Sequence, residues 1–398
     1  MPAEEKPYRV YRGGRVKGKV PTPARRGRPE RGARRERGDG RVDYRGPGAR
    51  ERSVSWGRRV ALGLLVLSLL GIVWAAMSFF AFRSGVRDAN NRLDPNTRLA
   101  LTDQGGLLMS HPTTILLLGT DHNKTGGREG DRHADSIMLV RTDPEHHRLA
   151  FLSIPRDLRV SIPGYSEQKI NAAYQIGGPA LAIKAIRGFT GLDVNHVIVV
   201  DFADFKDLID ALGGVDVTVP AAIVSNRFDC PYATQQRCQA WQGWRFPKGT
   251  QHMSGQRALV YSRIRENRLD ASDSDVTRAE RQQRVLQAIA SKLTSPGTLV
   301  KLPFMGRDLA TPLSTDLSAG QLAQLGWAKF RAPSGRALHC RLGGTLGSSA
   351  LGSTIDPTED NRNVIAMVLG QSAPQPPAPG SGPYGPGCVV GDEALPRS

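Results

Sequence analysis

The sequence predicts a layered α/β domain with a mixed central sheet, preceded by one transmembrane helix and a disordered basic tail. Three observations carry this prediction. Apolar strand runs alternate with helical patterns after residue 112. A charge-free apolar run occupies residues 60–82, and the residues before it are rich in Arg, Gly and Pro. A chain of 398 residues has room for one large or two ordinary domains.

The N-terminal segment, residues 1–59, carries most of the excess positive charge. The whole chain has a formal net charge of +17, and this segment holds 19 Lys and Arg against 7 Asp and Glu, about +12. It has too few aliphatic side chains to offset chain entropy, so we expect it to be disordered. A solvated tail that fixes topology, attraction to anionic lipid and non-specific RNA or DNA contact all fit this composition. No specific nucleic-acid partner is expected.

Residues 60–82 predict a single membrane span. The run is VALGLLVLSLLGIVWAAMSFFAF, and about 23 apolar residues suffice to cross roughly 30 Å of hydrocarbon. Arg58 and Arg59 precede it, and many more arginines lie further back. Because basic residues favour the cytoplasmic side, we expect a cytoplasmic N-terminus and an extracytoplasmic domain in the cell membrane. Residues 83–111 are predicted to form a polar stalk.

The folded domain is predicted over residues 112–370. Its first strands are TTILLLG, then SIMLVRT and RLAFLSI joined by the polar turn DPEHH. GPALAIKAIRGFTG follows as an amphipathic helix and HVIVVDF as a buried strand. DFKDLIDALGG reads as a helix ending at Gly213, VDVTVP as a strand and RAERQQRVLQAIASKL as a helix. EDNRNVIAMVLG predicts a last helix, and residues 371–398 are predicted to be a flexible Pro- and Gly-rich tail.

The four cysteines fit an extracytoplasmic domain, because an even number in an oxidising compartment favours disulfides. Cys230 and Cys238 lie eight residues apart in a polar loop, and we expect them to pair. A Cys340–Cys388 bond is the favoured second pairing. Three connectivities are formally possible.

Polar residues follow or open three predicted strands. Asp121 follows the first strand, Asp135 opens the second and Arg156 follows the third. Ligands bind at strand ends in α/β sheets, so these side chains could converge on one crevice. Two carboxylates with phosphate oxygens are the hard ligands that Mg²⁺ prefers. Capping or turn roles for the two aspartates remain equally open.

A second group of charged residues lies between residues 249 and 283. Arg263 and Arg265 are two apart on a segment predicted to be extended, so they would project to one face. Arg278 and Gln282 are four apart on the following helix and share one face. Asp275 precedes that helix and could cap it. Convergent guanidinium groups suit a diphosphate, although scattered surface arginines would give the same spacing.

Six ordered blocks between residues 114 and 293 resemble the LytR-CpsA-Psr (LCP) family of cell-wall ligases. The blocks are LLLGTD, ADSIML, SIPRDLRV, KINAAYQIGG, LIDALGGVDV and the array G-x-x-x-M-S-G-x-x-A-L-x-Y-x-R-x-R … D-x-x-R-x-x-x-Q. A basic tail with a single span is also the usual layout of this family. The resemblance implies an LCP-like α-β-α domain.

The resemblance also implies roles for single residues. Asp121 and Asp135 match the aspartates associated with Mg²⁺ (or Mn²⁺). The expected diphosphate-binding residues are Arg156, Arg263, Arg265, Arg278 and Gln282. Asp275 matches an acidic residue that could orient these arginines or help to deprotonate the acceptor, so the expected catalytic residues are Arg156, Arg263, Arg265 and Asp275. The lipid tunnel of the family could be lined here by Ile183, Ile186, Val199, Leu208 and Leu212, which ordinary core packing would equally explain.

The implied activity is phosphoryl transfer that moves a glycopolymer from a polyprenyl-diphosphate carrier to a sugar hydroxyl of peptidoglycan or another wall polymer. A pyrophosphatase that hydrolyses the same donor is one alternative. A membrane-tethered regulator that binds nucleic acid through its tail is another, as is a non-catalytic glycan-binding module. The sequence does not identify the polymer.

Overall fold

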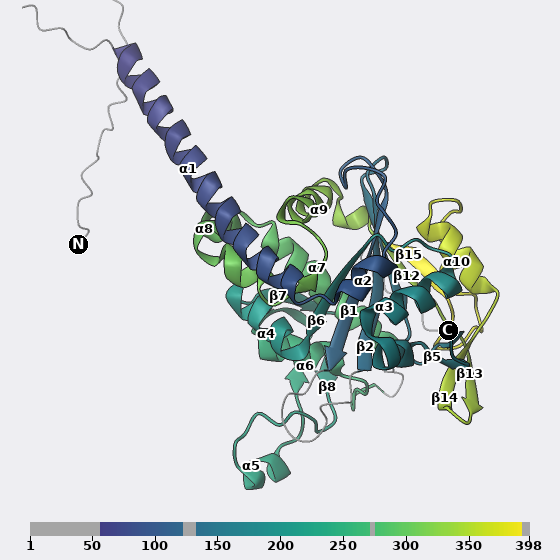
Figure 1. Cartoon of the computed structure of the whole chain (residues 1–398). Coiled ribbons are helices and arrows are strands. Elements are labelled where there is room, and N and C mark those ends of the chain that lie inside the picture. Colours follow the sequence, from purple (N-terminus) through teal and green to yellow (C-terminus); the bar gives the residue numbers. More distant parts are fainter. Residues whose placement is uncertain (1–55, 122–132, 271–274, 392–398) are drawn as a thin grey trace, which may run out of the picture. The chain divides into compact units, whose positions relative to one another are not determined.

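The centre of the computed structural model is a mixed seven-stranded sheet; the structure describes residues 56–121, 133–270 and 275–391. Its strands are β1 (Thr113–Asp121), β2 (His133–Asp143), β3 (Arg148–Ile154), β6 (His196–Asp201), β11 (Ser314–Thr315), β12 (Leu338–Arg341) and β15 (Gly387–Val390). Their order across the sheet is β11-β6-β1-β2-β3-β12-β15 (Figure 1). β1 runs parallel to β6 and β3 to β12, whereas the other neighbours are antiparallel. The predicted mixed sheet with an early hairpin is therefore confirmed.

The remaining elements surround this sheet. The helices are α1 (Trp56–Asn91), α2 (Pro95–Ala100), α3 (Ile170–Thr190), α4 (Phe202–Ala211), α5 (Gln235–Ala240), α6 (Gly255–Arg263), α7 (Asp275–Leu293), α8 (Pro296–Ala310), α9 (Ala319–Arg331), the short 3₁₀ turn η1 (Ser334–Arg336) and α10 (Asp360–Val368). Short strands pair outside the sheet, namely β4 (Arg159–Ser161) with β5 (Glu167–Lys169), β7 (Val215–Val219) with β10 (Gly249–Met253), β8 (Ile223–Val224) with β9 (Arg245–Phe246), and β13 (Gly344–Ser349) with β14 (Gly352–Pro357).

Two helical layers cover the two faces of the sheet. Alternate strand residues point to opposite faces, so Leu116 and Leu118 of β1 join a core with α3 and α10. Leu117, between them, packs on the other side, in a cluster with Leu322 and Leu325 of α9. The result is the α-β-α layering that the family resemblance implies (Figure 1).

α3 begins earlier than the helix predicted from GPALAIKAIRGFTG. It starts at Ile170 and includes a kink at Gly177 and Gly178, before Pro179. Gly178 has φ +60° and ψ −159°, a conformation that is essentially restricted to glycine. The sequence pattern revealed only the segment after this kink.

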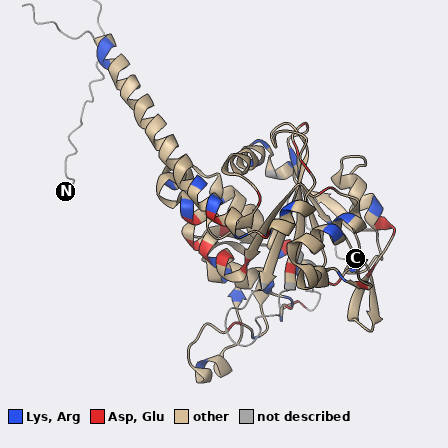
Figure 2. Ribbon diagram, viewed as in Figure 1, with Lys and Arg blue, Asp and Glu red and all other residues tan. Residues whose placement is uncertain are grey.

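α1 is the one helix, in the part of the chain that the structure describes, that is long and apolar enough to cross a membrane. It has 36 residues and a most apolar 18-residue window with mean hydropathy 2.5, none of it buried. Figure 2 shows its middle free of charged residues. The predicted span, residues 60–82, lies within it.

The predicted polar stalk is wrong for most of residues 83–111, because they pack on the domain. α1 continues nine residues past Phe82, to Asn91. Val86 and Ala89 at its end are buried, as are Leu93 before α2 and Leu108 before β1. These few apolar residues are widely spaced among polar ones, so no sequence period reveals them.

Gly85 permits the close approach of α1 to α8, and its substitution should be destabilising. A Cβ at Gly85 would lie 2.4 Å from the backbone oxygen of Arg307, whereas one at Gly71 would meet nothing within 4 Å. We expect Gly85→Ala to cost about 1–3 kcal/mol, because backbone must shift to accept the methyl group. Thermal unfolding in detergent measures this, with Gly71→Ala as the matched control. Equal midpoints for the two variants would show that α1 does not pack here.

The C-terminal segment corrects a second prediction. The chain from Gln371 was expected to be flexible throughout, but β15 is an edge strand of the sheet, antiparallel to β12. The structure joins Cys340 of β12 to Cys388 of β15, and Cys230 to Cys238. Both pairings are those favoured from the sequence, and their formation in the cell stays a prediction.

Candidate active site

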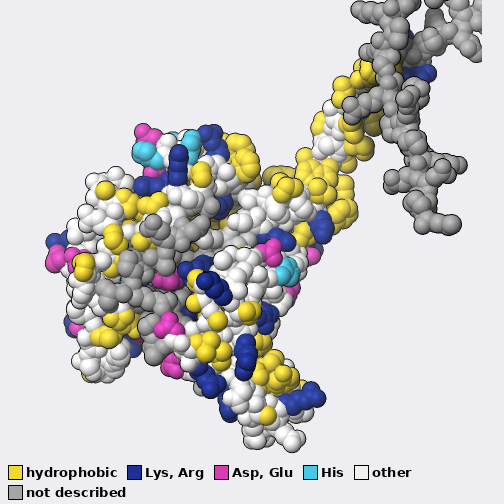
Figure 3. All heavy atoms as spheres, turned by 180° about the vertical axis from the view of Figure 1, so that it is seen from behind, with side chains coloured by type: hydrophobic (Ala, Val, Ile, Leu, Met, Phe, Trp, Pro, Cys, Tyr) yellow, Lys and Arg dark blue, Asp and Glu magenta, His cyan; other side chains and the backbone are white. Residues whose placement is uncertain are grey.

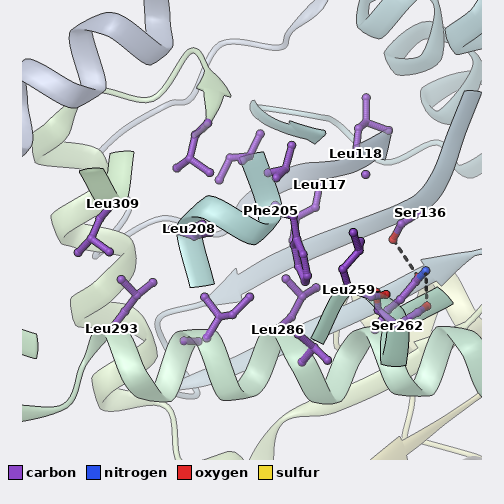
Figure 4. Close-up of a pocket in the computed structure, with 18 of the residues that line it drawn as sticks. Leu117, Leu118, Ser136, Phe205, Leu208, Leu259, Ser262, Leu286, Leu293 and Leu309 are labelled. Carbon is purple, nitrogen blue, oxygen red and sulfur yellow. Dashed lines mark hydrogen bonds between the residues drawn. The ribbon is translucent and has the colours of Figure 1, made fainter. Parts of the chain in front are cut away.

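A cavity of about 1020 Å³ lies between the sheet and the helices α4, α6, α7, α8 and α9. Most of its lining is apolar, with many leucines. Figure 4 shows leucines from Leu309 and Leu293 to Leu286 and Leu259, followed by a polar group at Ser136 and Ser262. The polar residues gathered at this end of the cavity are Asp135, Ser136, Asn226, Ser262, Arg263, Arg265, Glu266, Arg278 and Gln282. The cavity thus combines a long apolar part with a cluster of charges.

Asp135 is held in place by an arginine from the next strand. Arg156 follows β3, and its Nη1 donates to Asp135 Oδ1 at 2.7 Å. Its Nε donates to Asp157 Oδ2 at 3.3 Å, and Lys169 Nζ lies 3.0 Å from Asp157 Oδ1. This chain of alternating charges connects β2, β3 and β5. Asp135 lines the cavity, whereas Arg156 contacts Asp135 and is not among the lining residues.

Arg263 and Arg265 both line the cavity, but the predicted extended conformation is wrong for Arg263. α6 includes Arg263, and the helix ends because Ile264 is extended, with φ −59° and ψ 127°. The buried Ile264 side chain separates the two arginines. With this change from helix to extended chain, both arginines belong to the cavity lining.

Neighbours from two other segments position the Arg263 guanidinium. It lies over the Phe202 ring, 4.5 Å from the ring centre, and donates to the carboxylate of Asp229. Phe202 is the first residue of α4. Asp229 comes directly before Cys230, which begins the loop closed by the Cys230–Cys238 disulfide. A guanidinium stacked on an aromatic face loses little freedom when it binds a phosphate.

Arg278 and Gln282 lie one turn apart on α7 and both line the cavity, as their spacing predicts. Ser136 Oγ donates to Gln282 Oε1 at 2.9 Å, and Gln282 Nε2 donates to the Ser262 carbonyl at 3.5 Å (Figure 4). These bonds join β2, α6 and α7. Arg278 is largely buried, so its charge acts in a medium of lower dielectric constant than water.

A match to a known family covers most of the domain. The model of the LytR_cpsA_psr family matches residues 78–334, which is more than half of the chain. The matched segment contains Asp135 and all the cavity-lining arginines. This chain belongs to the LytR-CpsA-Psr family.

Individual relatives of this LCP protein are moderately similar in sequence. The polyisoprenyl-teichoic acid–peptidoglycan teichoic acid transferase TagV of Bacillus subtilis is 28% identical over 260 residues, which are 65% of this chain and 62% of TagV. Regulatory protein MsrR of Staphylococcus aureus is 32% identical over 215 residues, 54% of this chain and 59% of MsrR. The chain therefore spans less than two thirds of the length of these relatives. A structure described as TagT bound to LI-WTA has a TM-score of 0.51 at 25% identity, covering 67% of this chain and 94% of that one.

Two residues that the LCP resemblance selects, Asp121 and Asp275, lie at the edges of the described ranges. Asp121 ends β1 and Asp275 begins α7, but their side chains lie outside the described part of the structure. Asp275 is the first residue of the helix, and its capping role stays a prediction. The same holds for a metal site formed by Asp121 and Asp135.

Of the five apolar residues considered for the lipid tunnel, only Leu208 lines the cavity. The core on the opposite face of the sheet contains Ile183 and Ile186 of α3, and Val199 of β6 packs against it. Leu212 packs in a second core with β7. On β6, Ile198 and Val200 line the cavity instead, because successive strand residues alternate between faces.

Sequence reasoning missed several residues of this LCP site. Ser136 directly follows Asp135, and Asp201 caps α4 by accepting from the Asp204 backbone N–H at 2.7 Å. No sequence pattern predicts a role for Asp229 or Phe202, because only the folded chain brings them into contact with Arg263. Lys329 of α9 also lines the cavity, and burial lowers the pKa of its amine.

Proposed function

We propose that this protein is a membrane-anchored phosphotransferase that moves a glycopolymer from a polyprenyl-diphosphate carrier to a sugar hydroxyl of peptidoglycan. The observation that carries the proposal is one cavity with a long leucine-rich part and three arginines at its polar end. Its volume of about 1020 Å³ reaches the upper end of ordinary small-molecule sites, about 300–1000 Å³, as a long apolar chain requires. The name of TagV describes a transferase of this kind.

The cavity suggests how the donor binds. The polyprenyl chain would occupy the leucine-lined part, which excludes water. The diphosphate would then lie against Arg263, Arg265 and Arg278, whose forked donors match phosphate oxygens. Such preorganised positive groups stabilise the charge that develops on a transferring phosphoryl group.

The proposed reaction is one displacement at phosphorus. The acceptor hydroxyl attacks the phosphorus next to the sugar, a new O–P bond forms, and the bond to the bridging oxygen breaks. Polyprenyl phosphate leaves with the electron pair of that bond, and the hydroxyl proton passes to a base. Asp275 is the candidate for this base. Arg156 acts as a positioning residue, because it contacts Asp135 and does not line the cavity.

A divalent cation, Mg²⁺ or Mn²⁺, is proposed as the cofactor. Asp135 lines the cavity together with the arginines and would supply one carboxylate ligand, and Asp121 is the expected second ligand. Hard oxygen ligands suit either ion. When bound, the ion would neutralise charge on the phosphates.

The membrane location is part of the proposal. A donor with a polyprenyl tail stays in the bilayer, so a span at residues 60–82 keeps enzyme and donor on one surface. The basic segment before the span favours a cytoplasmic N-terminus, with the domain outside. MsrR is named as a regulatory protein. A purely regulatory role would not explain the cavity or the arginines that line it.

Transfer can be tested with the full chain in lipid vesicles and a labelled glycopolymer on a polyprenyl diphosphate. We expect the label to join added peptidoglycan, with one polyprenyl phosphate released for each polymer transferred. Without peptidoglycan, little polyprenyl phosphate should form. Equal release with and without the acceptor would instead support the pyrophosphatase alternative and reject transfer.

A further inference from the structure

α8 lies beside the last part of the apolar run of α1 and runs in the same direction. Trp74 Nε1 donates to the Val300 carbonyl at 3.1 Å. Further along, a Cβ at Gly306 would lie 3.1 Å from the Phe82 backbone nitrogen. Figure 1 shows α1 passing along α8 before it meets the rest of the domain. The two helices are therefore in contact over residues 74–82 of α1.

This contact fixes the depth of α8 if residues 60–82 span a bilayer. Trp74 lies about 12 Å before Phe82 along the helix axis, at about 1.5 Å per residue. The hydrocarbon layer is about 30 Å thick, so residues 74–82 occupy much of its outer half. Residues 300–306 of α8 must then lie at the same depth, since they pack against them.

The surface of α8 is suited to that depth. Val300 and Phe304 project apolar side chains that are 67% and 82% exposed. Lys301 lies between them, and its long side chain can extend to the headgroups. The first ion pair between the two helices comes later, between Arg307 and Asp88, whose Nη2 and Oδ2 are 3.1 Å apart. Figure 3 shows hydrophobic side chains continuing from α1 onto the adjoining part of the domain.

α9 also presents exposed aromatic side chains at the cavity. Trp327 and Phe330 stack with ring centres 5.6 Å apart, and Phe330 is 69% exposed. Both also line the cavity, as do Leu299 of α8 and Phe82 of α1. Residues that are both exposed and cavity-lining mark an opening. The apolar end of the cavity thus opens beside the span.

We propose that residues 300–306 of α8 lie in the outer leaflet, where they form, together with Trp327 and Phe330 of α9, a lateral opening of the cavity. The inference rests on the proposed function, since it takes residues 60–82 as the span and a polyprenyl chain as the ligand. The chain then passes from the leaflet into the cavity without crossing water. The occupant of this surface is lipid acyl chain.

Immersion can be measured with a fluorescent label and lipids that carry nitroxide quenchers on their acyl chains. The native cysteines are all paired in the structure, so single Phe304→Cys, Leu70→Cys and Leu346→Cys variants of the full chain are labelled in vesicles. Leu346 of β13 is 60% exposed and is the matched apolar control. We expect labels at positions 70 and 304 to be quenched several-fold more than the label at position 346.

The outcomes separate this inference from the proposed function. Quenching at position 70 without quenching at 304 overturns immersion of α8 and leaves the span intact. No quenching at position 70 removes the span, and the inference falls with it. Label-to-label energy transfer at position 304 without lipid quenching would show that a second copy covers this face, which also overturns the inference.

The lateral opening can be tested by introducing negatively charged side chains on the exposed face of α8. Val300→Glu with Phe304→Glu should slow transfer from a long-chain donor in vesicles about tenfold, because carboxylates are unfavourable among acyl chains. Transfer from a short-chain, water-soluble donor should stay unchanged, since neither residue lines the cavity. Leu346→Glu should affect neither donor. Equal slowing of both donors, or of neither, would contradict a lateral opening.

Discussion

Replacing Arg263 or Arg265 with alanine should lower the rate of glycopolymer transfer by about 30- to 1000-fold, or roughly 2–4 kcal/mol of transition-state stabilisation. Both guanidinium groups line the polar end of the cavity. Charge develops on the phosphoryl group during transfer, and a fixed donor stabilises this charge without the free-energy cost of reorienting water. The measurement is kcat with labelled lipid-linked polymer and excess peptidoglycan.

The controls separate lost chemistry from lost structure. Arg362→Ala removes an exposed arginine of α10 that pairs with Glu359, 2.8 Å away, on the other face of the sheet, and it should leave kcat unchanged. Arg263 also contacts Asp229 and Phe202, so the unfolding midpoint of each variant must be compared with that of the parent chain. Near-normal turnover by either folded alanine variant would refute the assignment of the arginines.

Ala290→Trp should make the enzyme selective for donors with short lipid chains. Ala290 lines the apolar part of the cavity on α7, two turns after Gln282, or about 12 Å along the helix. An indole ring there would fill space that the distal part of a long chain needs, without reaching the arginines. We expect long-chain donors to lose about 100-fold in kcat/KM, because a blocked apolar chain forfeits the burial of several methylene groups. Short-chain donors should keep most of their rate.

The neighbouring residue supplies the matched control. Ser291 is exposed on the same helix, so Ser291→Trp adds the same ring outside the cavity and should affect neither donor. The two variants are compared across donors of increasing chain length. If Ala290→Trp slowed short and long donors equally, the apolar part of the cavity would not hold the lipid.

The sequence predicted the first part of the domain well because its signals are local. β1 and β3 are nearly continuous apolar runs, and buried strands of this kind are recognisable without a partner. β12 is only four residues, LHCR, and gains its place between β3 and β15 from long-range pairing. α8 contains Pro303 and two glycines, which argue against a helix when read locally. The burial of its packing face depends on α1.

Site residues could be predicted where they fall within sequence blocks that resemble the family. They could not be predicted where only the fold brings distant residues together. Arg263, Arg278 and Gln282 fall within such a block, and all three line the cavity. Asp229 meets Arg263 across 34 residues of sequence, and no local pattern encodes that distance. The helical conformation of Arg263 was missed because the strand-like alternation of Arg263 and Arg265 hides the helix end at Ile264.

The position of β12 and β15 determines where the protein can be shortened for expression. The family match ends at residue 334, but β12 and β15 follow it and complete the sheet. A chain cut at that point would expose the β3 edge, whose unpaired N–H and C=O groups invite pairing between molecules. Cys340 and Cys388 also face each other across these two strands. A chain shortened only after β15 would keep the edge covered, so tags for purification belong beyond residue 391.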